Sequence, residues 1–376
     1  MRLMATILLV MMFCHAHCNT LLPTKQLYLD ESIYDLNNTQ ALVKFRKGAE
    51  NKPLVIFIPG GANLARIAYG YPGGNPRDFM DYWLSKAEFS FMGISYPSDN
   101  KVFTKLTPDF TIQDWGNQVM HIAKVLIKRN KLPDHVIIAA WSMAGVSASA
   151  LSDAAYHQGL TIDLFVSLAA TPPLPDLISD QENTIRQLPN GLSDRITLRT
   201  KRFLAFIHEE NDLNKHIIIP DNIYKSDFLT NVPVNLLNTA IRYQKGNFVK
   251  NFSANIADTH TFHYANYPFI AVIHGDSLSD AQHVLTDKMT WFMLASQMIY
   301  RRCKFFQEGV PIANNKWQHI RTLIDSLPEQ FLITIPGNHF FFIGEKGAKN
   351  TVDALIHLYK KSKFMQYELK QSCGYT

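Results

Sequence analysis

The sequence has few charged residues and no long run of either sign. Asp, Glu, Lys and Arg make up 18% of the 376 residues, and the formal net charge is only +5. Binding to a phosphate backbone needs a concentrated basic surface, so we predict no nucleic-acid partner. Hydrophobic residues make up 47% of the chain, enough for a substantial core, which excludes global disorder.

The glycine motifs that cradle phosphates are also absent, since neither a phosphate loop nor a dinucleotide fingerprint occurs. We therefore expect no cofactor. One weak metal motif is present, formed by Asp258, His260 and His263. It has no nearby cysteine and no further paired ligand, so we interpret it as a solvated loop and predict no metal site.

Cysteine is scarce, with four residues in the chain. Cys14 and Cys18 close an N-terminal segment in which Arg2 precedes an apolar run, the layout of a signal peptide. This run is too short to span a bilayer comfortably. We predict a signal peptide over residues 1–18 and a secreted or periplasmic protein, with an uncleaved membrane anchor as the less favoured alternative. The sequence leaves open whether Cys303 and Cys373 then pair.

Short apolar runs alternate with helical patterns along much of the chain. Strands are expected at 54–58, 89–96, 136–140, 164–169, 269–273 and 331–335, and helices at 114–128, 142–155 and 287–306. This alternation predicts an α/β fold with a mainly parallel sheet and helices on both faces. Residues 175–267 break the rhythm, with helical patches at 201–208 and 234–243. We interpret 175–267 as a helical cap inserted between two parts of one core, 19–174 and 268–376.

The strongest functional signal lies where the expected strand at 136–140 ends. Ser142 follows this strand and has Ala140 two positions before it and Ala144 two positions after it, with Gly145 next. A serine exposed on a sharp strand-to-helix turn needs small residues at these positions, where the usual pattern has glycine.

Four features together resemble the α/β-hydrolase superfamily over roughly residues 50–360. They are the turn Pro59-Gly60-Gly61-Ala62, the elbow Trp141-Ser142-Met143, the strand ending His274-Gly275-Asp276, and Ile335-Pro336-Gly337-Asn338-His339-Phe340. The superfamily order of nucleophile, acid and histidine implies Ser142 as the nucleophile and His339 as the base. The resemblance also implies an oxyanion hole formed by the N–H of Met143 and that of Gly61 or Ala62.

The acid of this triad is less well defined, because both candidates are displaced from the usual position. Ser279 and Gln282 have the spacing of a helix capping box, which would give Asp280 a structural role in a first helical turn. We therefore favour Asp276 as the acid and keep Asp280 as the alternative.

The function that follows is a secreted serine hydrolase that cleaves lipid-like or small acyl esters through an acyl-enzyme. A thioesterase or a peptidase with the same triad is the first alternative, and a non-catalytic binding protein is the second. Residues 275–278 also spell the G-D-S-L motif of another lipase class, which would make Ser277 the nucleophile. The expected partner is an ester substrate, together with a peripheral contact to a membrane surface. The oligomeric state is left open.

Overall fold

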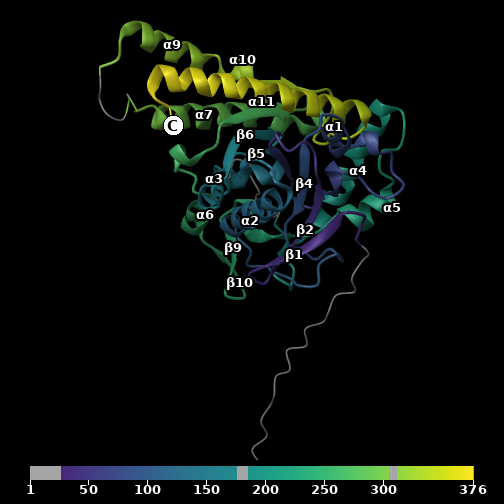
Figure 1. Ribbon diagram of the computed structural model, residues 1–376. Helices are drawn as coiled ribbons and strands as arrows, with labels where there is room; N and C mark the ends of the chain where they lie inside the picture. Colours follow the sequence, from purple (N-terminus) through teal and green to yellow (C-terminus); the bar gives the residue numbers. More distant parts are fainter. Residues whose placement is uncertain (1–26, 176–184, 305, 307–310, 376) are drawn as a thin grey trace, which may run out of the picture.

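The computed structural model describes residues 27–175, 185–304, 306 and 311–375 (Figure 1). The expected signal peptide, residues 1–18, lies outside them. The described residues contain an eight-stranded sheet in the order β1-β2-β4-β3-β5-β6-β11-β12. Its strands are β1 (Glu31–Leu36), β2 (Thr39–Arg46), β3 (Leu54–Ile58), β4 (Ser90–Ser95), β5 (His135–Trp141), β6 (Thr161–Leu168), β11 (Ile270–His274) and β12 (Leu332–Thr334).

The sheet is mainly parallel, as expected. The strands β4, β3, β5, β6, β11 and β12 run parallel to one another, whereas β2 pairs antiparallel with both β1 and β4. β3 is a continuous apolar run and is buried along its whole length, as is typical of a strand covered on both faces. The expected α/β class and all six expected core strands are confirmed, with shifts of a few residues at their ends.

Helices cover both faces of this sheet. α1 (Met80–Lys86) packs against the long α11 (Glu345–Cys373) on one face, and α2 (Ile112–Asn130) packs against α3 (Ala148–His157) on the other (Figure 1). The C-terminal half adds α7 (Lys288–Arg302), α9 (Asn314–Asp325) and α10 (Leu327–Phe331). A capping box formed by Thr111 and Asp114 begins α2, and Lys131 in the left-handed conformation ends it.

The hairpin of β1 and β2 at one edge of the sheet was not expected from the sequence. It is anchored by a buried ion pair, in which the Arg66 guanidinium donates to both carboxylate oxygens of Glu31, at 2.8 and 2.6 Å. The Tyr28 ring lies 3.6 Å from the guanidinium carbon. Since both charged side chains are fully buried, each depends on the other for compensation.

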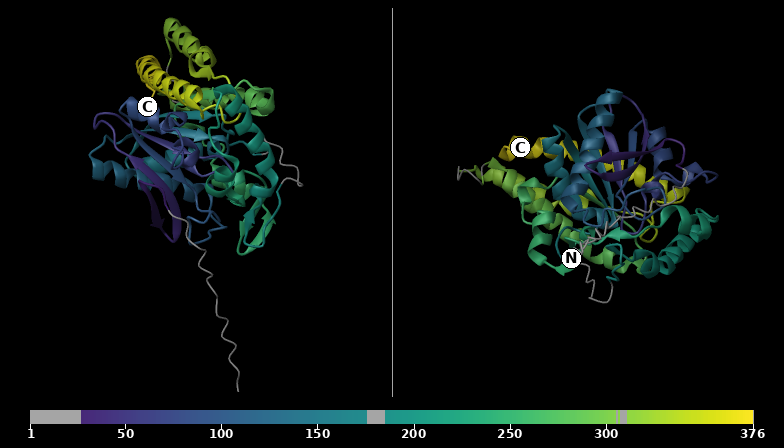
Figure 2. Two further views of the ribbon diagram at one scale, coloured as in Figure 1. Left: turned by 90° about the vertical axis from the view of Figure 1, so that its right-hand side faces the viewer. Right: turned by 90° about the horizontal axis from the view of Figure 1, so that it is seen from below.

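The chain between β6 and β11 forms a separate layer of short elements. It contains β7 (Leu192–Ser193), α4 (Arg195–Asn214), α5 (Asp221–Ile223), β8 (Val232–Pro233), β9 (Ile241–Gln244), β10 (Asn247–Lys250) and α6 (Phe252–Thr259). This layer, teal to green in Figure 2, contacts the turns that follow β3 and β5. The expected helical patch at 234–243 is wrong, because the helical turn of Val234–Leu237 ends at Asn238 (φ 56°) and β9 follows it.

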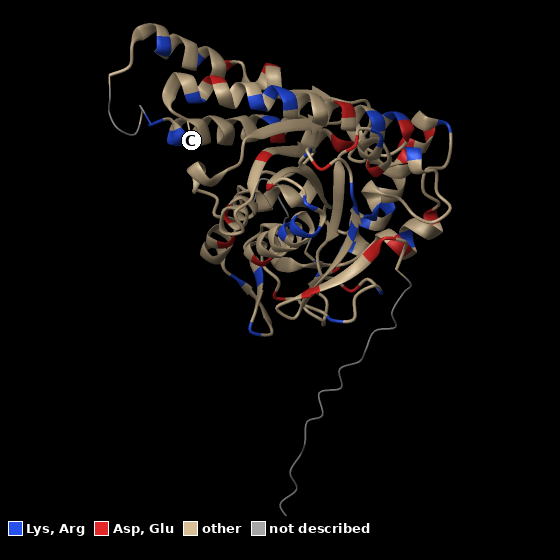
Figure 3. Ribbon diagram, viewed as in Figure 1, with Lys and Arg blue, Asp and Glu red and all other residues tan. Residues whose placement is uncertain are grey.

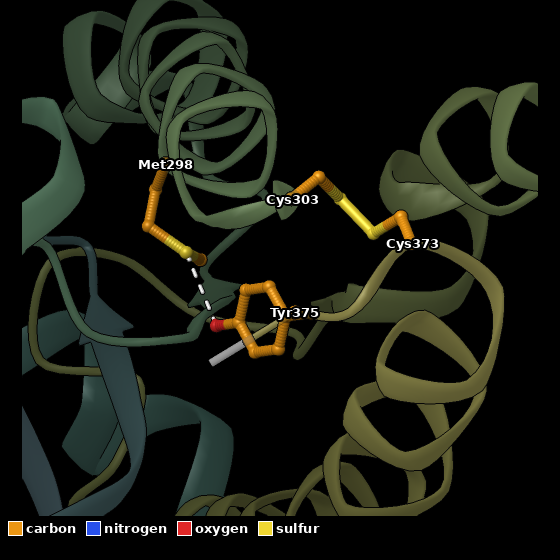
Figure 4. Close-up of a disulfide and its surroundings, with 4 residues drawn as sticks. All are labelled: Met298, Cys303, Cys373 and Tyr375. Carbon is orange, nitrogen blue, oxygen red and sulfur yellow. Dashed lines mark hydrogen bonds between the residues drawn. A yellow bond between two sulfur atoms is a disulfide. The ribbon is translucent and has the colours of Figure 1, made fainter. Parts of the chain in front are cut away.

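A disulfide joins Cys303, which follows α7, to Cys373 at the end of α11 (Figure 4). The two Cα atoms are 5.1 Å apart, a separation that a disulfide can bridge. Beside it, the Tyr375 hydroxyl donates to the Met298 sulfur. Lys and Arg positions are interspersed with Asp and Glu positions along the ribbon in Figure 3. No helix in the described ranges is long and apolar enough to cross a membrane.

Candidate active site

Ser142 lies on the sharp turn that the sequence predicts. β5 ends at Trp141, and Ser142 begins a short 3₁₀ helix with a positive φ of 53°. This backbone conformation is costly for a residue other than glycine, and such strain is typical of functional turns. The position after this turn where the chain has no room for a side chain is Gly145 rather than Ala144. A Cβ added to Gly145 would lie 2.3 Å from the Thr171 carbonyl oxygen.

The turn after β3 packs directly against this serine. A Cβ added to Gly60 would lie 2.6 Å from the Ser142 Cβ, so glycine is required there. A Cβ on Gly61 would lie 3.3 Å from the Met143 sulfur. The two glycines therefore allow the backbone of this turn to lie against the Ser142 turn, which is the arrangement that the expected oxyanion hole needs.

The position of this turn is set by contacts from both sides. On one side, the Tyr96 hydroxyl donates to the Gly60 carbonyl at 3.2 Å and also interacts with the N–H groups of Ala62 and Asn63. On the other side, the inserted layer forms an antiparallel bridge, with Thr230 N–H donating to the Ala62 carbonyl at 3.1 Å. Both expected donors, Gly61 and Ala62, belong to this turn.

His339 lies in the loop after β12 and is paired with Asp280. Its Nδ1 is 2.9 Å from the Asp280 Oδ2, and both side chains are buried. Burial lowers the pKa of His339, and the nearby His283 lowers it further. The Asp280 charge raises this pKa but does not outweigh the two. Burial also works to raise the pKa of Asp280, but the charge and hydrogen bond of His339 bring it below its usual value. The pair therefore favours a neutral imidazole beside an ionised carboxylate.

Asp276, the acid that we favoured, makes a different contact. Its carboxylate accepts from the Gly337 N–H at 3.0 Å, and the Gly337 carbonyl accepts from the Asp276 N–H at 3.0 Å. This reciprocal pair joins the loop after β11 to the loop of His339. Asp280 does lie in a first helical turn, as expected, but Ser277 rather than Ser279 caps this turn, and the Asp280 carboxylate is bonded to His339.

The elbow and the histidine loop are joined through Trp141. Its indole N–H donates to the His339 carbonyl at 3.0 Å, and the centroids of the two rings are 5.4 Å apart. In the described residues, Ser142 Oγ makes no hydrogen bond to His339. Hydrogen bonds between nucleophile and base are commonly long in the absence of substrate and tighten when it binds.

A second histidine–carboxylate pair, which the sequence analysis missed, lies beside the first. The His283 ring stacks on His339 with centroids 4.6 Å apart, and its Nδ1 is 2.6 Å from Asp287 Oδ2. Burial tends to lower the pKa of His283, but Asp287 outweighs it and raises this pKa above its usual value. The i, i+4 spacing of His283 and Asp287 on one helix was the available signal.

The inserted layer also touches the histidine loop. Phe206 of α4 packs against His339 at a centroid distance of 6.3 Å, so this aromatic residue packs the layer onto the loop. Glu210 of α4 accepts from the Asn338 N–H at 2.8 Å. Burial raises the pKa of Glu210 to about 7. An open cavity of about 700 Å³ lies beside this loop, lined by Asp276, Gly337 and the C-terminal part of α4.

In the part of the chain that the structure describes, two groups of side chains have metal-ligand chemistry. One is Asp280, His283 and His339, which lies beside the serine turn and in which a carboxylate holds each histidine Nδ1. The other combines His260 and His263 with Asp153 of α3. The expected third member, Asp258, instead caps α2 and pairs with Arg242 at 2.6 Å.

Solved structures similar to this chain include esterases and a thioesterase domain, all at low sequence identity. No known family profile and no curated protein matches the sequence. A thermophilic esterase from Thermogutta terrifontis is similar in structure, with 10% identity over 88% of this chain and 98% of that chain and a TM-score of 0.49. A structure described under carboxylesterases of Nitrososphaera gargenis has 13% identity over 89% and 99%, with a TM-score of 0.46.

A thioesterase domain from the curacin biosynthetic pathway is 11% identical over 87% of this chain and 98% of that chain, with a TM-score of 0.45. The molecule itself has the strand order of this sheet, the serine turn after β5, and Asp280 and His339 paired from the loops after β11 and β12. The chain has the fold of the α/β-hydrolase superfamily.

Proposed function

We propose that this protein is a secreted serine hydrolase that cleaves carboxylic esters, with Ser142 as nucleophile, His339 as base and Asp280 as acid. The observation that carries the proposal is the buried His339–Asp280 hydrogen bond, tied through Trp141 to the strained serine turn. A serine is a weak nucleophile unless a base oriented by a third group accepts its proton. This site provides the oriented base.

The reaction proceeds in two steps. Ser142 Oγ attacks the carbonyl carbon of the ester while His339 Nε2 accepts its proton, and Asp280 stabilises the imidazolium. The oxyanion is held by the N–H of Met143 and that of Gly61 or Ala62. The alcohol departs with the proton from His339, which leaves an acyl-enzyme. A water molecule, deprotonated by His339, then releases the carboxylic acid and restores Ser142.

Lipid-like acyl esters are the substrate class that we favour. Leu278, Leu285 and Met289 are apolar, at least 64% exposed, and flank Asp280 and His283 along the chain. An apolar rim of this kind suits an acyl chain or a peripheral contact with a lipid surface. Secretion is supported by the Cys303–Cys373 disulfide, since disulfides persist in oxidising compartments.

Labelling with a serine-directed fluorophosphonate tests the nucleophile. We expect one adduct by intact mass on the mature wild type and on Ser277→Ala, and none on Ser142→Ala. Labelling that is lost only in Ser277→Ala would move the site to the G-D-S-L motif. A folded wild type that does not label would favour the binding protein. Hydrolysis of matched esters and thioesters of increasing acyl length then separates the esterase from the thioesterase.

The two aspartates provide a matched pair for the acid. Asp280→Asn should lower kcat by about 10³- to 10⁴-fold, because the imidazole loses its orientation and its counter-charge. Asp276→Asn keeps the size of the side chain and should retain most of the activity, since Asp276 binds the loop backbone. The reverse order of effects would refute the assignment of Asp280.

A further inference from the structure

His260 and His263 lie next to each other at the end of the inserted layer. His260 ends α6 with a positive φ of 50°, and the His263 N–H donates to the His260 carbonyl at 2.9 Å. This turn places the two imidazole rings 4.5 Å apart. Two neighbouring imidazoles are a common starting point for a metal site.

A carboxylate from the hydrolase core completes the group. Asp153 of α3 lies with its Oδ2 2.6 Å from the His260 Nδ1. Its other oxygen, Oδ1, accepts from the Asn266 side-chain amide at 2.7 Å. This outer contact holds the carboxylate in place, as the outer partners of metal ligands commonly do.

The spacing of the three ligand atoms suits a small divalent ion. One atom from each of Asp153, His260 and His263 lies within 4.8 Å of the others. In a tetrahedral zinc site with bonds of about 2.1 Å, ligand atoms are roughly 3.4 Å apart. An ion would therefore replace the 2.6 Å hydrogen bond between His260 and Asp153 and draw His263 towards them. Two nitrogen atoms and one oxygen favour Zn²⁺ over the oxygen-seeking Mg²⁺ and Ca²⁺.

We propose that Asp153, His260 and His263 form a binding site for a divalent transition metal such as Zn²⁺, with solvent as the fourth ligand. The ion joins α3, the helix that follows the serine elbow, to the chain that enters β11. Its role is structural, because none of the three residues belongs to the proposed triad. The bound ion would connect the end of the inserted layer to the core and stabilise this contact.

Zinc titration of the full mature chain tests this site. We would measure Zn²⁺ affinity by calorimetry, together with the melting temperature, for the wild type, His263→Ala and Asp153→Asn. His263 is exposed, so its replacement should leave the fold intact. The matched control is His208→Ala, since His208 is also exposed and pairs with Asp221 at 2.8 Å. His339→Ala removes the second group of metal-ligand residues, at the active site.

The proposal expects one Zn²⁺ per chain with unchanged affinity in His208→Ala and His339→Ala, and at least tenfold weaker binding in His263→Ala and Asp153→Asn. Zn²⁺ should raise the melting temperature of the wild type but not that of His263→Ala. Binding that survives His263→Ala, or that is lost only in His339→Ala, would overturn it, as would a wild type that binds no Zn²⁺.

Discussion

Loss of the Cys303–Cys373 disulfide should destabilise the protein strongly without disabling the site. The bond closes a loop between residues 70 apart in sequence, which includes β12, His339 and α11. In the chain-entropy description, a crosslink over a loop of this length removes about 15 cal/mol/K of entropy from the unfolded chain, or about 4 kcal/mol at 25 °C. The native contacts of His339 do not involve either cysteine.

Urea unfolding at fixed pH measures this effect. The comparison is between the oxidised wild type and the same protein reduced with dithiothreitol, which has the same side chains. Cys303→Ala/Cys373→Ala is a second test, because both residues are buried and a serine hydroxyl would lack a partner. The free energy of unfolding should fall by about 4 kcal/mol in both cases, while kcat under native conditions should stay within a factor of two or so.

Two results would refute this reasoning. A loss of stability below about 1 kcal/mol would mean that the unfolded chain is not constrained by the bond. A large fall in kcat at low temperature, with the fold retained, would mean that the disulfide holds the histidine loop in its active geometry.

Three further predictions concern buried ionisable groups. His283→Phe keeps a ring against His339 but removes a positive charge that lowers the pKa of His339. The acidic limb of kcat/KM should therefore move to higher pH in a pH–rate profile. A limb that does not move would exclude this coupling. Glu210 binds its proton more tightly in the folded protein, because its pKa is raised from 4.5 to about 7. The free energy of unfolding should therefore fall by roughly 3 kcal/mol as the pH rises between these values. In urea titrations, Glu210→Gln should remove most of this pH dependence. Arg66→Met leaves the Glu31 carboxylate buried without its partner and should lower the free energy of unfolding in urea by about 3–5 kcal/mol. The double variant Arg66→Met/Glu31→Leu should recover much of this free energy. Equal losses in the two variants would exclude the ion-pair explanation.

The central strands could be predicted because burial on both faces leaves a clear mark in the sequence. The strand 54–58 has five successive apolar residues and is found with these bounds. β1 has no such mark, since five of its six residues are partly or fully exposed, and its anchor, Arg66, lies 35 positions from Glu31. A patch of apolar residues at 234–243 was taken for a helix, but the turn at Asn238 and the β9–β10 hairpin determine its structure.

The turns that carry Ser142 and His339 could be predicted from local motifs and chain order, but the carboxylate that pairs with His339 could not. Asp280 sits in a segment with a capping pattern, and a local pattern gives no information on which distant side chain it meets. The hydrogen bond to His339 is a contact across 59 residues. His283 was missed for the same reason, since only the folded chain brings its ring onto His339.

The hydrogen bond from Trp141 to the His339 carbonyl also has a consequence for timing. It joins residues 198 apart, and such long-range contacts form late in folding. During synthesis the serine turn emerges long before the histidine loop does. On the proposed mechanism, a growing chain therefore has no base for Ser142 until the segment that carries His339 has been synthesised.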